Sequence, residues 1–268
     1  MIPKIIHYCW FGGNPLPPLA VKCLESWKKY CPDYEIKQWN ENNFDINFNT
    51  YTKEAYEEKK WAFVSDVARL YAVYSDGGVY FDTDVEMIKP IDCFLSNSMF
   101  LGFESLNHVN TGLGFGAKKN FYLVERLLAA YEGQSFIDHN GTNNTTPCPV
   151  YNSAAIRQEG FLLNNTMQTK NNVTLYPIEY FCPKDGKTGN VTITENTYAI
   201  HHFDGSWLTD EQKQEYILIT EYRNKYGRIL GEIIYTVIAI CTFRKSGISN
   251  IVEKTKSRVI SRTRISVR

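Results

Sequence analysis

The stretch from residue 61 to residue 85 constrains the fold of this chain more than any other part. Apolar residues recur at helical spacing from Trp61 to Asp76, and no Pro or Gly interrupts them. Gly77 and Gly78 end this helix, because glycine readily adopts the left-handed conformation common at helix C-termini. Residues 78–85 (GVYFDTDV) then read as a buried strand. The chain is therefore expected to contain a helix that leads directly into a core strand, as in an α/β domain.

Two carboxylates, Asp82 and Asp84, interrupt this otherwise apolar strand. Residues two apart on a strand point to the same face, so both carboxylates are expected to project together, with Tyr80 behind them. Two like charges side by side are costly to bury unless a cation neutralises them. Oxygen ligands without a nearby Cys or His suit Mg²⁺ or Mn²⁺, which keep coordination positions open for substrate phosphates. The pair predicts a metal–diphosphate site, although an Asp-x-Asp sequence by itself also fits an acidic strand end in solvent.

Two charged residues, Asp66 and Arg69, lie within the apolar helix at i and i+3 and hence on one face. By themselves they fit a local salt bridge on the helix surface. Because the helix leads through two glycines into the acidic strand, both charges can instead border the same pocket as the two carboxylates. The planar guanidinium offers a fork of donors that matches phosphate or sugar oxygens.

The sequence around these residues resembles the sugar-binding "DXD" region of family 32 glycosyltransferases. The resemblance rests on three motifs in the order of the family: residues 2–13 (IPKIIHYCWFGG), residues 62–71 with 77–84 (AFVSDVARLY and GGVYFDTD), and residues 201–207 (HHFDGSW). It spans roughly residues 2–210. The family includes yeast mannosyltransferases, bacterial capsule and lipopolysaccharide sugar transferases and, more distantly, the clostridial glucosylating toxins.

The resemblance implies a GT-A fold and a role for each matching residue. Asp66 would accept hydrogen bonds from donor hydroxyls, Arg69 would contact the donor sugar or phosphate, and both are expected to act in catalysis with Asp84. The expected metal ligands are Asp82, Asp84 and His202. The expected donor-binding residues are Tyr8, Trp10, Asp66, Arg69, Tyr80, Asp82, Asn110, Ser206 and Trp207. Trp10 and Trp207 also fit the core, and the adjacent His201 leaves the choice of histidine open.

These expectations describe a metal-dependent retaining glycosyltransferase that uses Mn²⁺ or Mg²⁺ and a nucleotide-diphosphate sugar. A UDP-sugar is favoured over GDP-mannose, because the bacterial and toxin members point to UDP. The expected acceptor is an oligosaccharide or a lipid-linked saccharide in capsule or lipopolysaccharide assembly. No carboxylate stands out as a nucleophile, which favours same-face attack by the acceptor hydroxyl. The alternatives are a nucleotide-sugar hydrolase and a catalytically inactive carbohydrate-binding module; the intact site residues argue against the second.

Length and composition fit one compact enzyme domain. The 268 residues suit a single α/β domain, and the net charge of zero gives no reason to expect nucleic acid as a partner. The seven cysteines are scattered, odd in number and without a Cys-x-x-Cys pair, which argues against a zinc site and a full disulfide framework. No signal peptide precedes the first strand, so the protein is expected in the cytoplasm.

Strands and helices are expected to alternate along the chain, which predicts a mixed, largely parallel sheet with its ligand at the carboxyl ends of the strands. The expected strands are residues 4–10, 35–39, 78–85, 99–103 and 112–117, and the expected helices are residues 19–30, 51–60, 61–76, 120–131 and 152–159.

The catalytic domain is expected to cover residues 1–228, and residues 229–268 to form a C-terminal extension. Residues 229–243 are almost wholly apolar but too short, and interrupted by Glu232, for a membrane span. Residues 244–268 contain eight Lys or Arg and one Glu. An apolar helix followed by a basic segment fits peripheral docking to the anionic inner face of the cell membrane. A last helix packed on the domain, followed by a disordered tail, fits as well.

Overall fold

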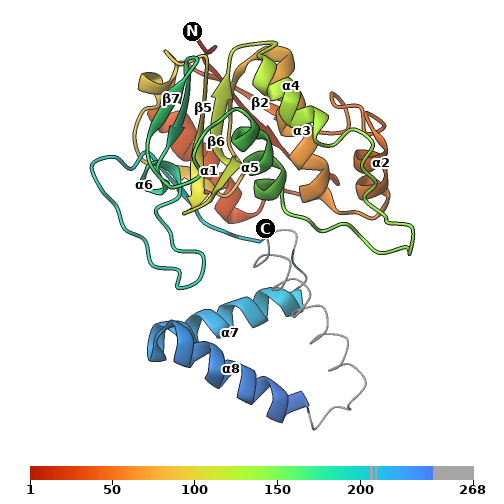
Figure 1. Cartoon of the computed structure of the whole chain (residues 1–268), viewed down its shortest axis with the longest axis vertical. Helices are drawn as coiled ribbons and strands as arrows, with labels where there is room; N and C mark the ends of the chain where they lie inside the picture. Colours follow the sequence, from red (N-terminus) through yellow and green to blue (C-terminus); the bar gives the residue numbers. More distant parts are fainter. Residues whose placement is uncertain (206–207, 209, 244–268) are drawn as a thin grey trace. The chain divides into compact units, whose positions relative to one another are not determined.

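The computed structural model describes residues 1–205, 208 and 210–243, and the chain divides into two compact units (Figure 1). The first unit contains Met1–Asp185 and the chain from Asn190 to residue 207, and the second contains Gly186–Gly189 and the chain from Leu208 onward. The division therefore lies near residue 207 rather than at the expected residue 228. The reason is that helix α7 (Asp210–Tyr226) packs against helix α8 (Arg228–Phe243) within the second unit.

The elements of the first unit are, in chain order, β1 (Ile5–Cys9), α1 (Pro18–Tyr30), β2 (Glu35–Trp39), α2 (Thr50–Glu57), α3 (Trp61–Asp76), β3 (Gly78–Tyr80), β4 (Val85–Met87), the 3₁₀ turn η1 (Asp92–Phe94), β5 (Met99–Ser105), β6 (His108–Ala117), α4 (Tyr122–Ala129), α5 (Cys148–Gln158), β7 (Gln168–Lys170), β8 (Val173–Tyr176), α6 (Ile178–Phe181) and β9 (Ala199–His201).

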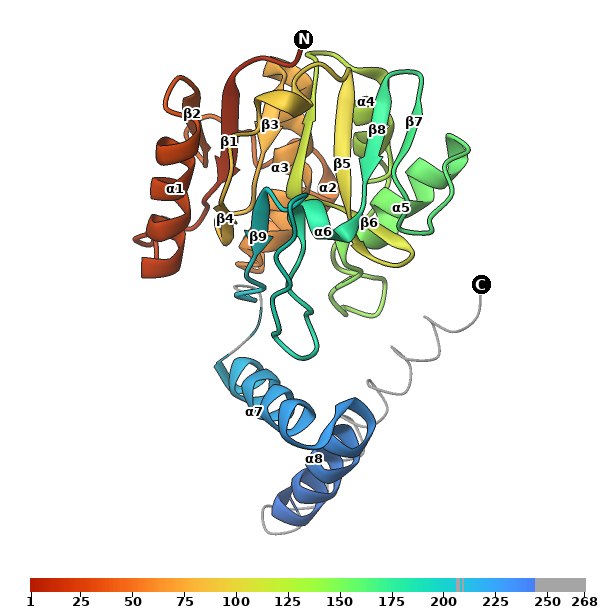
Figure 2. The same ribbon diagram turned by 90° about the vertical axis from the view of Figure 1, so that its left-hand side faces the viewer.

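A seven-stranded mixed sheet with the order β2-β1-β3-β6-β5-β8-β7 forms the centre of the first unit (Figure 2). β1 pairs in parallel with β2 and β3, and β5 pairs in parallel with β8. β6 is antiparallel to both of its neighbours, and β7 is antiparallel to β8. Five of the seven strands thus share one direction. The expected α/β fold, with a mixed and mostly parallel sheet flanked by helices, is confirmed.

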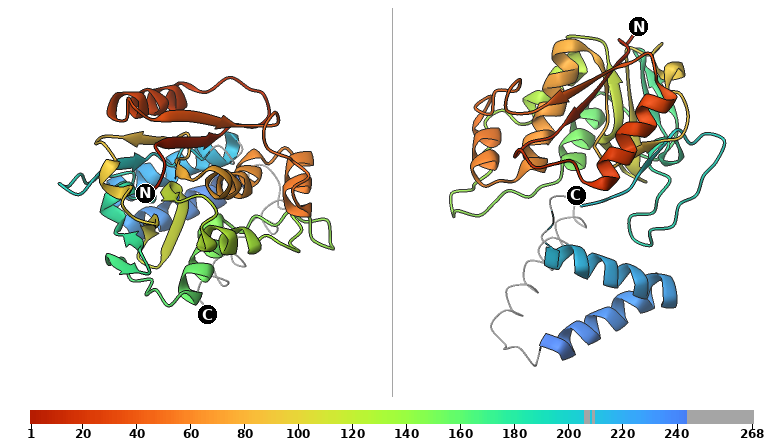
Figure 3. Two further views of the ribbon diagram at one scale, coloured as in Figure 1. Left: turned by 90° about the horizontal axis from the view of Figure 1, so that it is seen from above. Right: turned by 180° about the vertical axis from the view of Figure 1, so that it is seen from behind.

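Helices cover both faces of this sheet (Figures 2 and 3). Helix α3 packs against β1, β3 and β6, and α2 and α4 pack beside it. On the opposite face lie α1, α6 and a small antiparallel sheet of β4 and β9. Because side chains alternate across a strand, Cys9 and Tyr80 enter the core beneath α3, whereas Ile6 and Val79 enter the core beneath α1. The residue two positions after Tyr80, Asp82, is thereby directed to the side of α3.

The second unit is built around a hairpin of α7 and α8. No helix in the described part of the chain is long and apolar enough to cross a membrane. The basic segment of residues 244–268, for which the sequence leaves two interpretations, lies outside the described residues.

Candidate active site

Helix α3 and strand β3 are joined by the tight turn that the two glycines allow. The Gly77 N–H donates to the carbonyl of Val73 at 2.9 Å and closes the helix. Both glycines have positive φ, 69° at Gly77 and 111° at Gly78, which residues with a Cβ rarely adopt. A Cβ on Gly78 would lie 2.7 Å from the carbonyl oxygen of Ile5 on the neighbouring strand. The glycines therefore bring the end of α3 close against the sheet.

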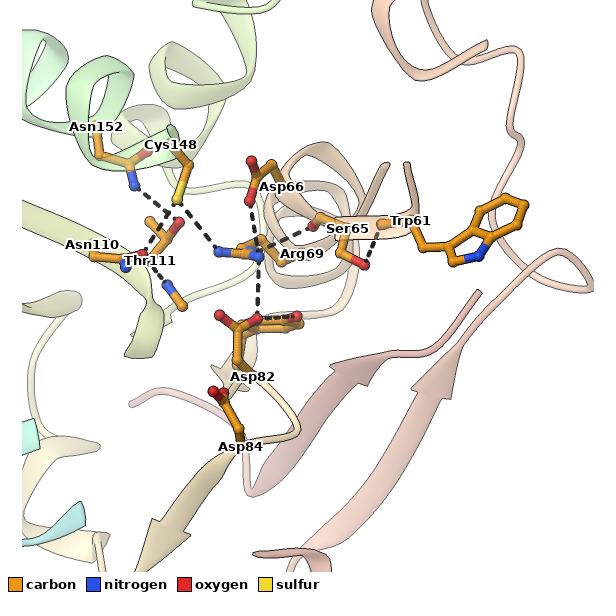
Figure 4. Close-up of polar contacts among 12 residues, drawn as sticks. Trp61, Ser65, Asp66, Arg69, Asp82, Asp84, Asn110, Thr111, Cys148 and Asn152 are labelled. Carbon is orange, nitrogen blue, oxygen red and sulfur yellow. Dashed lines mark hydrogen bonds and ion pairs between the residues drawn. The ribbon is translucent and has the colours of Figure 1, made fainter. Parts of the chain in front are cut away.

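The guanidinium of Arg69 is the centre of a buried ion cluster, the Arg69 cluster, formed with Asp66 and Asp82 (Figure 4). Arg69 Nη2 lies 2.9 Å from Asp66 Oδ1 and 3.1 Å from Asp82 Oδ1, and Arg69 Nε donates to the carbonyl of Ser65 at 3.2 Å. The Arg69 side chain is only 4% exposed, so the alternative of a salt bridge on the helix surface is wrong. Since its Nε and Nη2 already serve protein partners, Arg69 orients the two carboxylates, and the predicted contact with the donor stays a prediction.

The Arg69 cluster changes the acidity of its carboxyl groups. Burial raises the pKa of Asp66 to about 6, although the charge of Arg69 opposes this shift. Burial also raises the pKa of Asp82, again against the charge of Arg69 and with the repulsion of Asp84 adding to the rise. Without the guanidinium, neither carboxylate could remain ionised at this depth at neutral pH.

Asp82 and Asp84 lie in the turn between β3 and β4, not on one continuous strand as the apolar pattern predicted. The Val85 N–H donates to the carbonyl of Asp82 at 3.0 Å, which closes the turn. The hydroxyl of Tyr80 donates to Asp82 Oδ1 at 2.9 Å. The predicted proximity of the two carboxylates therefore holds, but a turn and not strand alternation produces it.

Strand β6 supports Asp82 with its backbone. The pairing of β5 with β6 jumps from Leu101–Phe115 to Gly102–Asn110, so residues 111–114 leave the ladder with β5. Within this excursion the carbonyl of Gly112 accepts the Asp82 N–H at 3.0 Å, and a Cβ on Gly112 would lie 2.1 Å from Asp82 Oδ2. Only a residue without a side chain fits beneath this carboxylate.

Asn110 holds this excursion in place. Its Oδ1 accepts the Gly112 N–H at 2.6 Å and the Cys148 thiol at 3.3 Å, while its Nδ2 donates to Glu104 Oε2 at 2.5 Å. Asn110 is only 7% exposed. Its predicted role in binding the donor sugar therefore stays a prediction, and the geometry gives it a supporting role for the backbone around Gly112.

Strand β9 brings a histidine to the carboxylates from the far end of the unit. β9 pairs with β4 so that His201 lies opposite Val85, and the His202 N–H donates to the carbonyl of Asp84 at 2.9 Å. His201 Nε2 lies 3.3 Å from Asp84 Oδ1. Ligand atoms of Asp82, Asp84 and His201 all lie within 4.8 Å of one another. We call these three residues the DDH set.

The predicted ligand His202 takes no part in the DDH set. Its Nε2 lies 2.9 Å from Glu86 Oε2, on the face of the β4–β9 ribbon opposite to His201. His201 is the last residue of β9, and the side chain of His202, which follows it directly, points to the opposite side, as successive side chains of extended backbone do. The histidine beside the carboxylates is therefore His201, one residue before the predicted ligand, and a metal-binding role for His202 stays a prediction.

The pair of Asp84 and His201 already behaves as an ion pair. Burial favours the neutral acid, but the charge and hydrogen bond of His201, with the Asp204 N–H at 2.9 Å, lower the pKa of Asp84 below its ordinary value. Burial disfavours the imidazolium, yet Asp84 raises the pKa of His201 well above its ordinary value. A proton on His201 thus supplies the positive charge that two adjacent carboxylates require. A cation bound by the DDH set would replace this proton, and an imidazole among carboxylates suits Mn²⁺ better than Mg²⁺.

The replacement Gly112→Ala is expected to weaken Mn²⁺ binding by about 10- to 100-fold, because the new methyl group must displace the Asp82 carboxylate. Titration calorimetry with Mn²⁺ measures this loss. Gly133→Ala is the matched control, since a Cβ at Gly133 meets nothing within 4 Å and costs only the strain of a φ of +68°. Equal Mn²⁺ affinity in the two variants would contradict the contact of Gly112 with Asp82.

The other predicted residues are not brought together equally. The ring of Tyr8 is 7% exposed and packs edge-on against Trp27, with its hydroxyl donating to Gln38 Oε1 at 2.9 Å. Tyr8 is therefore packed in the core, and its predicted role in binding the donor stays a prediction. Trp10 is partly buried, and its Nε1 donates to the carbonyl of Asn14 at 2.6 Å. Ser206 and Trp207 lie outside the described residues.

Sequence reasoning missed two residues of helix α5, of which one contacts Arg69 and the other contacts strand β6. The Cys148 sulfur lies 3.6 Å from Arg69 Nη1, and Asn152 Nδ2 donates to Thr111 Oγ1 at 3.0 Å (Figure 4). No local signal marks Cys148 or Asn152, because their role depends on how α5 packs against β6. No sequence pattern within the three residues of β9 distinguishes His201 from the adjacent His202.

Comparison with known families agrees with the motif positions. Residues 17–101 match the family model described as "Glycosyltransferase sugar-binding region containing DXD motif". This range contains α3, both aspartates of the β3–β4 turn and Arg69. The resemblance to DXD glycosyltransferases that the sequence suggested is confirmed.

Two curated relatives come from Schizosaccharomyces pombe. The chain is 27% identical over 111 residues to inositol phosphoceramide mannosyltransferase 1, a match that covers 37% of this chain and 33% of the relative. It is 28% identical over 131 residues to inositol phosphoceramide mannosyltransferase 3, covering 46% of this chain and 35% of the relative. The chain thus matches about a third of the length of each of these relatives.

Two solved glycosyltransferase structures align with parts of this chain. The PaToxG glycosyltransferase aligns with a TM-score of 0.47 and 19% identity, over 59% of this chain and 70% of that protein. A glycosyltransferase involved in glycosylation of the major capsid of PBCV-1 aligns with a TM-score of 0.45 and 13% identity, over 80% of this chain and 99% of that protein.

Proposed function

We propose that this chain, whose residues 17–101 match the sugar-binding region of DXD-containing glycosyltransferases, transfers a sugar from a nucleotide-diphosphate donor with the help of a divalent cation. The observation that carries this proposal is the convergence of the DDH set with the Arg69 cluster at the turn between β3 and β4. Asp82 belongs to both groups. The same carboxylate is therefore positioned by a buried guanidinium and available to a cation.

The residues of the site have separate roles in the proposed reaction. A cation held by the DDH set would neutralise the negative charge that develops on the leaving diphosphate. Arg69 keeps Asp66 and Asp82 ionised and oriented from beneath. Asp66, held by Arg69 at the edge of the site, accepts hydrogen bonds from hydroxyls of the donor sugar. The carbonyl of Gly112 and the hydroxyl of Tyr80 hold Asp82 in position within the β3–β4 turn.

Two considerations bear on the identity of the donor, and they favour different nucleotide sugars. The bacterial and toxin members of the resembled family favour a UDP-sugar. The names of the two matching relatives make mannose, carried by GDP, the alternative. The acceptor is an oligosaccharide or a lipid-linked saccharide of capsule or lipopolysaccharide assembly, which places the reaction in the cytoplasm or at the inner face of the cell membrane.

Transfer with retained configuration proceeds here by same-face attack of the acceptor hydroxyl. The carboxylates at the centre of the site are each engaged, Asp66 and Asp82 by Arg69 and Asp84 by His201, which disfavours any of them as a covalent nucleophile. Trapping a glycosylated Asp or Glu by mass spectrometry would overturn this part of the proposal. The same site with water as acceptor would hydrolyse the donor, and product analysis with and without acceptor separates the two activities.

The adjacent histidines give a matched test of the cation site. Thermal unfolding is measured with UDP- and GDP-sugars, each with Mn²⁺ and with EDTA. We expect a Mn²⁺-dependent stabilisation by one nucleotide class, in line with the linkage between binding and stability. His201→Ala is expected to raise the Mn²⁺ concentration needed by about 10- to 100-fold, whereas His202→Ala leaves it nearly unchanged.

The opposite order of the two variants would restore His202 as the ligand and overturn the DDH set. No stabilisation by any donor in folded protein, with or without Mn²⁺, would favour the inactive binding module instead. An inactive module that still binds a donor would show the stabilisation but form no product.

A further inference from the structure

Helices α7 and α8 of the second unit pack closely against each other, and their contacts show which side of α8 faces α7. A Cβ on Gly231 would lie 2.5 Å from the carbonyl of Tyr222, so the helix backbones approach closely at this point. Tyr235 is buried, and its hydroxyl donates to Glu215 at 2.7 Å. Arg223 Nη2 lies 2.7 Å from Glu232 Oε1. These contacts direct Gly231 and Tyr235 of α8 toward α7.

The outer side of α8 carries an apolar stripe of Ile229, Ile233 and Val237. The three side chains are spaced four residues apart and therefore follow one face of the helix. They are 77%, 55% and 54% exposed, and Leu230 beside them is 52% exposed. In the described part of the chain this stripe is an exposed apolar surface, and such surfaces mark binding sites for proteins or membranes.

The net charge of the chain has opposite signs before and after the end of α8. Residues 244–268 contain eight Lys or Arg and one Glu, a net charge of +7, so residues 1–243 carry a net charge of −7. A basic segment by itself fits any anionic surface, nucleic acid included. A basic segment that directly follows an apolar stripe fits a surface that offers both phosphate and hydrocarbon.

We propose that the α8 stripe and the basic segment together bind the surface of a membrane that contains anionic phospholipids. Ile229, Ile233 and Val237 enter the boundary between head groups and acyl chains, and the Lys and Arg residues of 244–268 bind the lipid phosphates. Such docking would hold the enzyme of the proposed function at the surface where lipid-linked saccharides are presented.

Co-sedimentation of the full chain with vesicles tests this proposal. We compare vesicles of phosphatidylcholine alone with vesicles that also contain phosphatidylglycerol, in low salt and in about 0.5 M NaCl, where screening weakens surface charge interactions. The expected result is binding to the anionic vesicles that is at least about tenfold tighter than to the neutral ones and that weakens in high salt. Binding that is equal on both kinds of vesicle, or absent from both, would overturn the proposal.

Two variants separate the contributions of the stripe and of the charge. Ile233→Glu with Val237→Glu is expected to weaken binding to anionic vesicles by about tenfold or more. Lys254→Gln with Lys256→Gln and Arg258→Gln is expected to reduce the salt dependence in part, because it removes three of the eight basic charges of residues 244–268. Leu162→Glu with Ile193→Glu is the matched control, since these apolar side chains are 65% and 52% exposed on the first unit. A stripe variant that binds like the control would overturn the proposal, as would a stripe variant that only converts a dimer to a monomer in sedimentation velocity. An unchanged nucleotide-dependent thermal shift in every variant keeps this test separate from the test of the proposed function.

Discussion

The replacement Asp84→Asn is expected to lower the rate of sugar transfer by about 10³-fold. Asp84 shares the DDH set with Asp82 and His201, and its carboxylate is the one whose pKa lies below its ordinary value. The neutral amide is a weak ligand for a hard cation, so under the proposed function the cation that stabilises the leaving diphosphate would be held less tightly. A loss of several kcal/mol of such stabilisation corresponds to a rate decrease of about this size.

The measurement is the initial rate of donor consumption and of product formation at saturating Mn²⁺, with Glu86→Gln as the control. Glu86 lies two residues away on β4, but it pairs with Lys22 and His202 on the other face and belongs to neither the DDH set nor the Arg69 cluster. We expect Glu86→Gln to change the rate only a few-fold. Rates that fall equally in both variants would show that the whole β4–β9 ribbon, and not the carboxylate of Asp84, supports activity.

The local parts of this site could be predicted from the sequence. Helix α3 begins and ends at the predicted residues, and its Asp66 and Arg69 share a face as their i, i+3 spacing required. Gly77 and Gly78, which follow α3, adopt the positive φ angles that glycine tolerates and end the helix as predicted. The proximity of Asp82 to Asp84 was also predicted, but for a reason that the structure corrects. Asp and Thr favour turns, and this preference won over the apolar pattern of the surrounding strand.

The long-range parts could not be predicted in the same way. The contact of Gly112 with Asp82 depends on a four-residue excursion of β6 from its partner β5, and no sequence pattern marks that register change. Strand β7 is short and polar (QTK), and β9 has three residues, so neither produces a strong strand signal. His201 reaches Asp84 only because β9 pairs with β4 in one particular register. A pairing shifted by one residue would have brought His202 to the site.

The replacement Arg69→Met is expected to destabilise the first unit by about 3–5 kcal/mol. Arg69 is the cation between Asp66 and Asp82, and its removal leaves two carboxyl groups buried without a compensating charge. Arg126→Met is the matched control, because Arg126 pairs with Glu159 at 2.6 Å but is 58% exposed. An exposed pair of this kind contributes at most about 1 kcal/mol. Equal losses in the two variants would show that the Arg69 cluster is not a buried electrostatic centre.

The pH dependence of this loss distinguishes a missing charge from a missing side chain. Burial holds the pKa of Asp66 at about 6 in the folded protein, above the value of about 3.9 in an unfolded chain, and removing Arg69 raises the folded pKa further. A carboxyl group with a raised folded pKa binds its proton more tightly in the folded state, so ionising it at higher pH destabilises the fold. Because the folded pKa of Asp66 is higher in Arg69→Met than in wild type, the destabilisation of the variant relative to wild type grows as pH rises above about 6. Denaturant unfolding followed by tryptophan fluorescence reports on the first unit, since all five Trp residues precede residue 208. The difference between Arg69→Met and wild type should therefore be larger at pH 8 than at pH 5. A pH-independent difference would mean that Arg69 stabilises the fold through packing of its side chain instead.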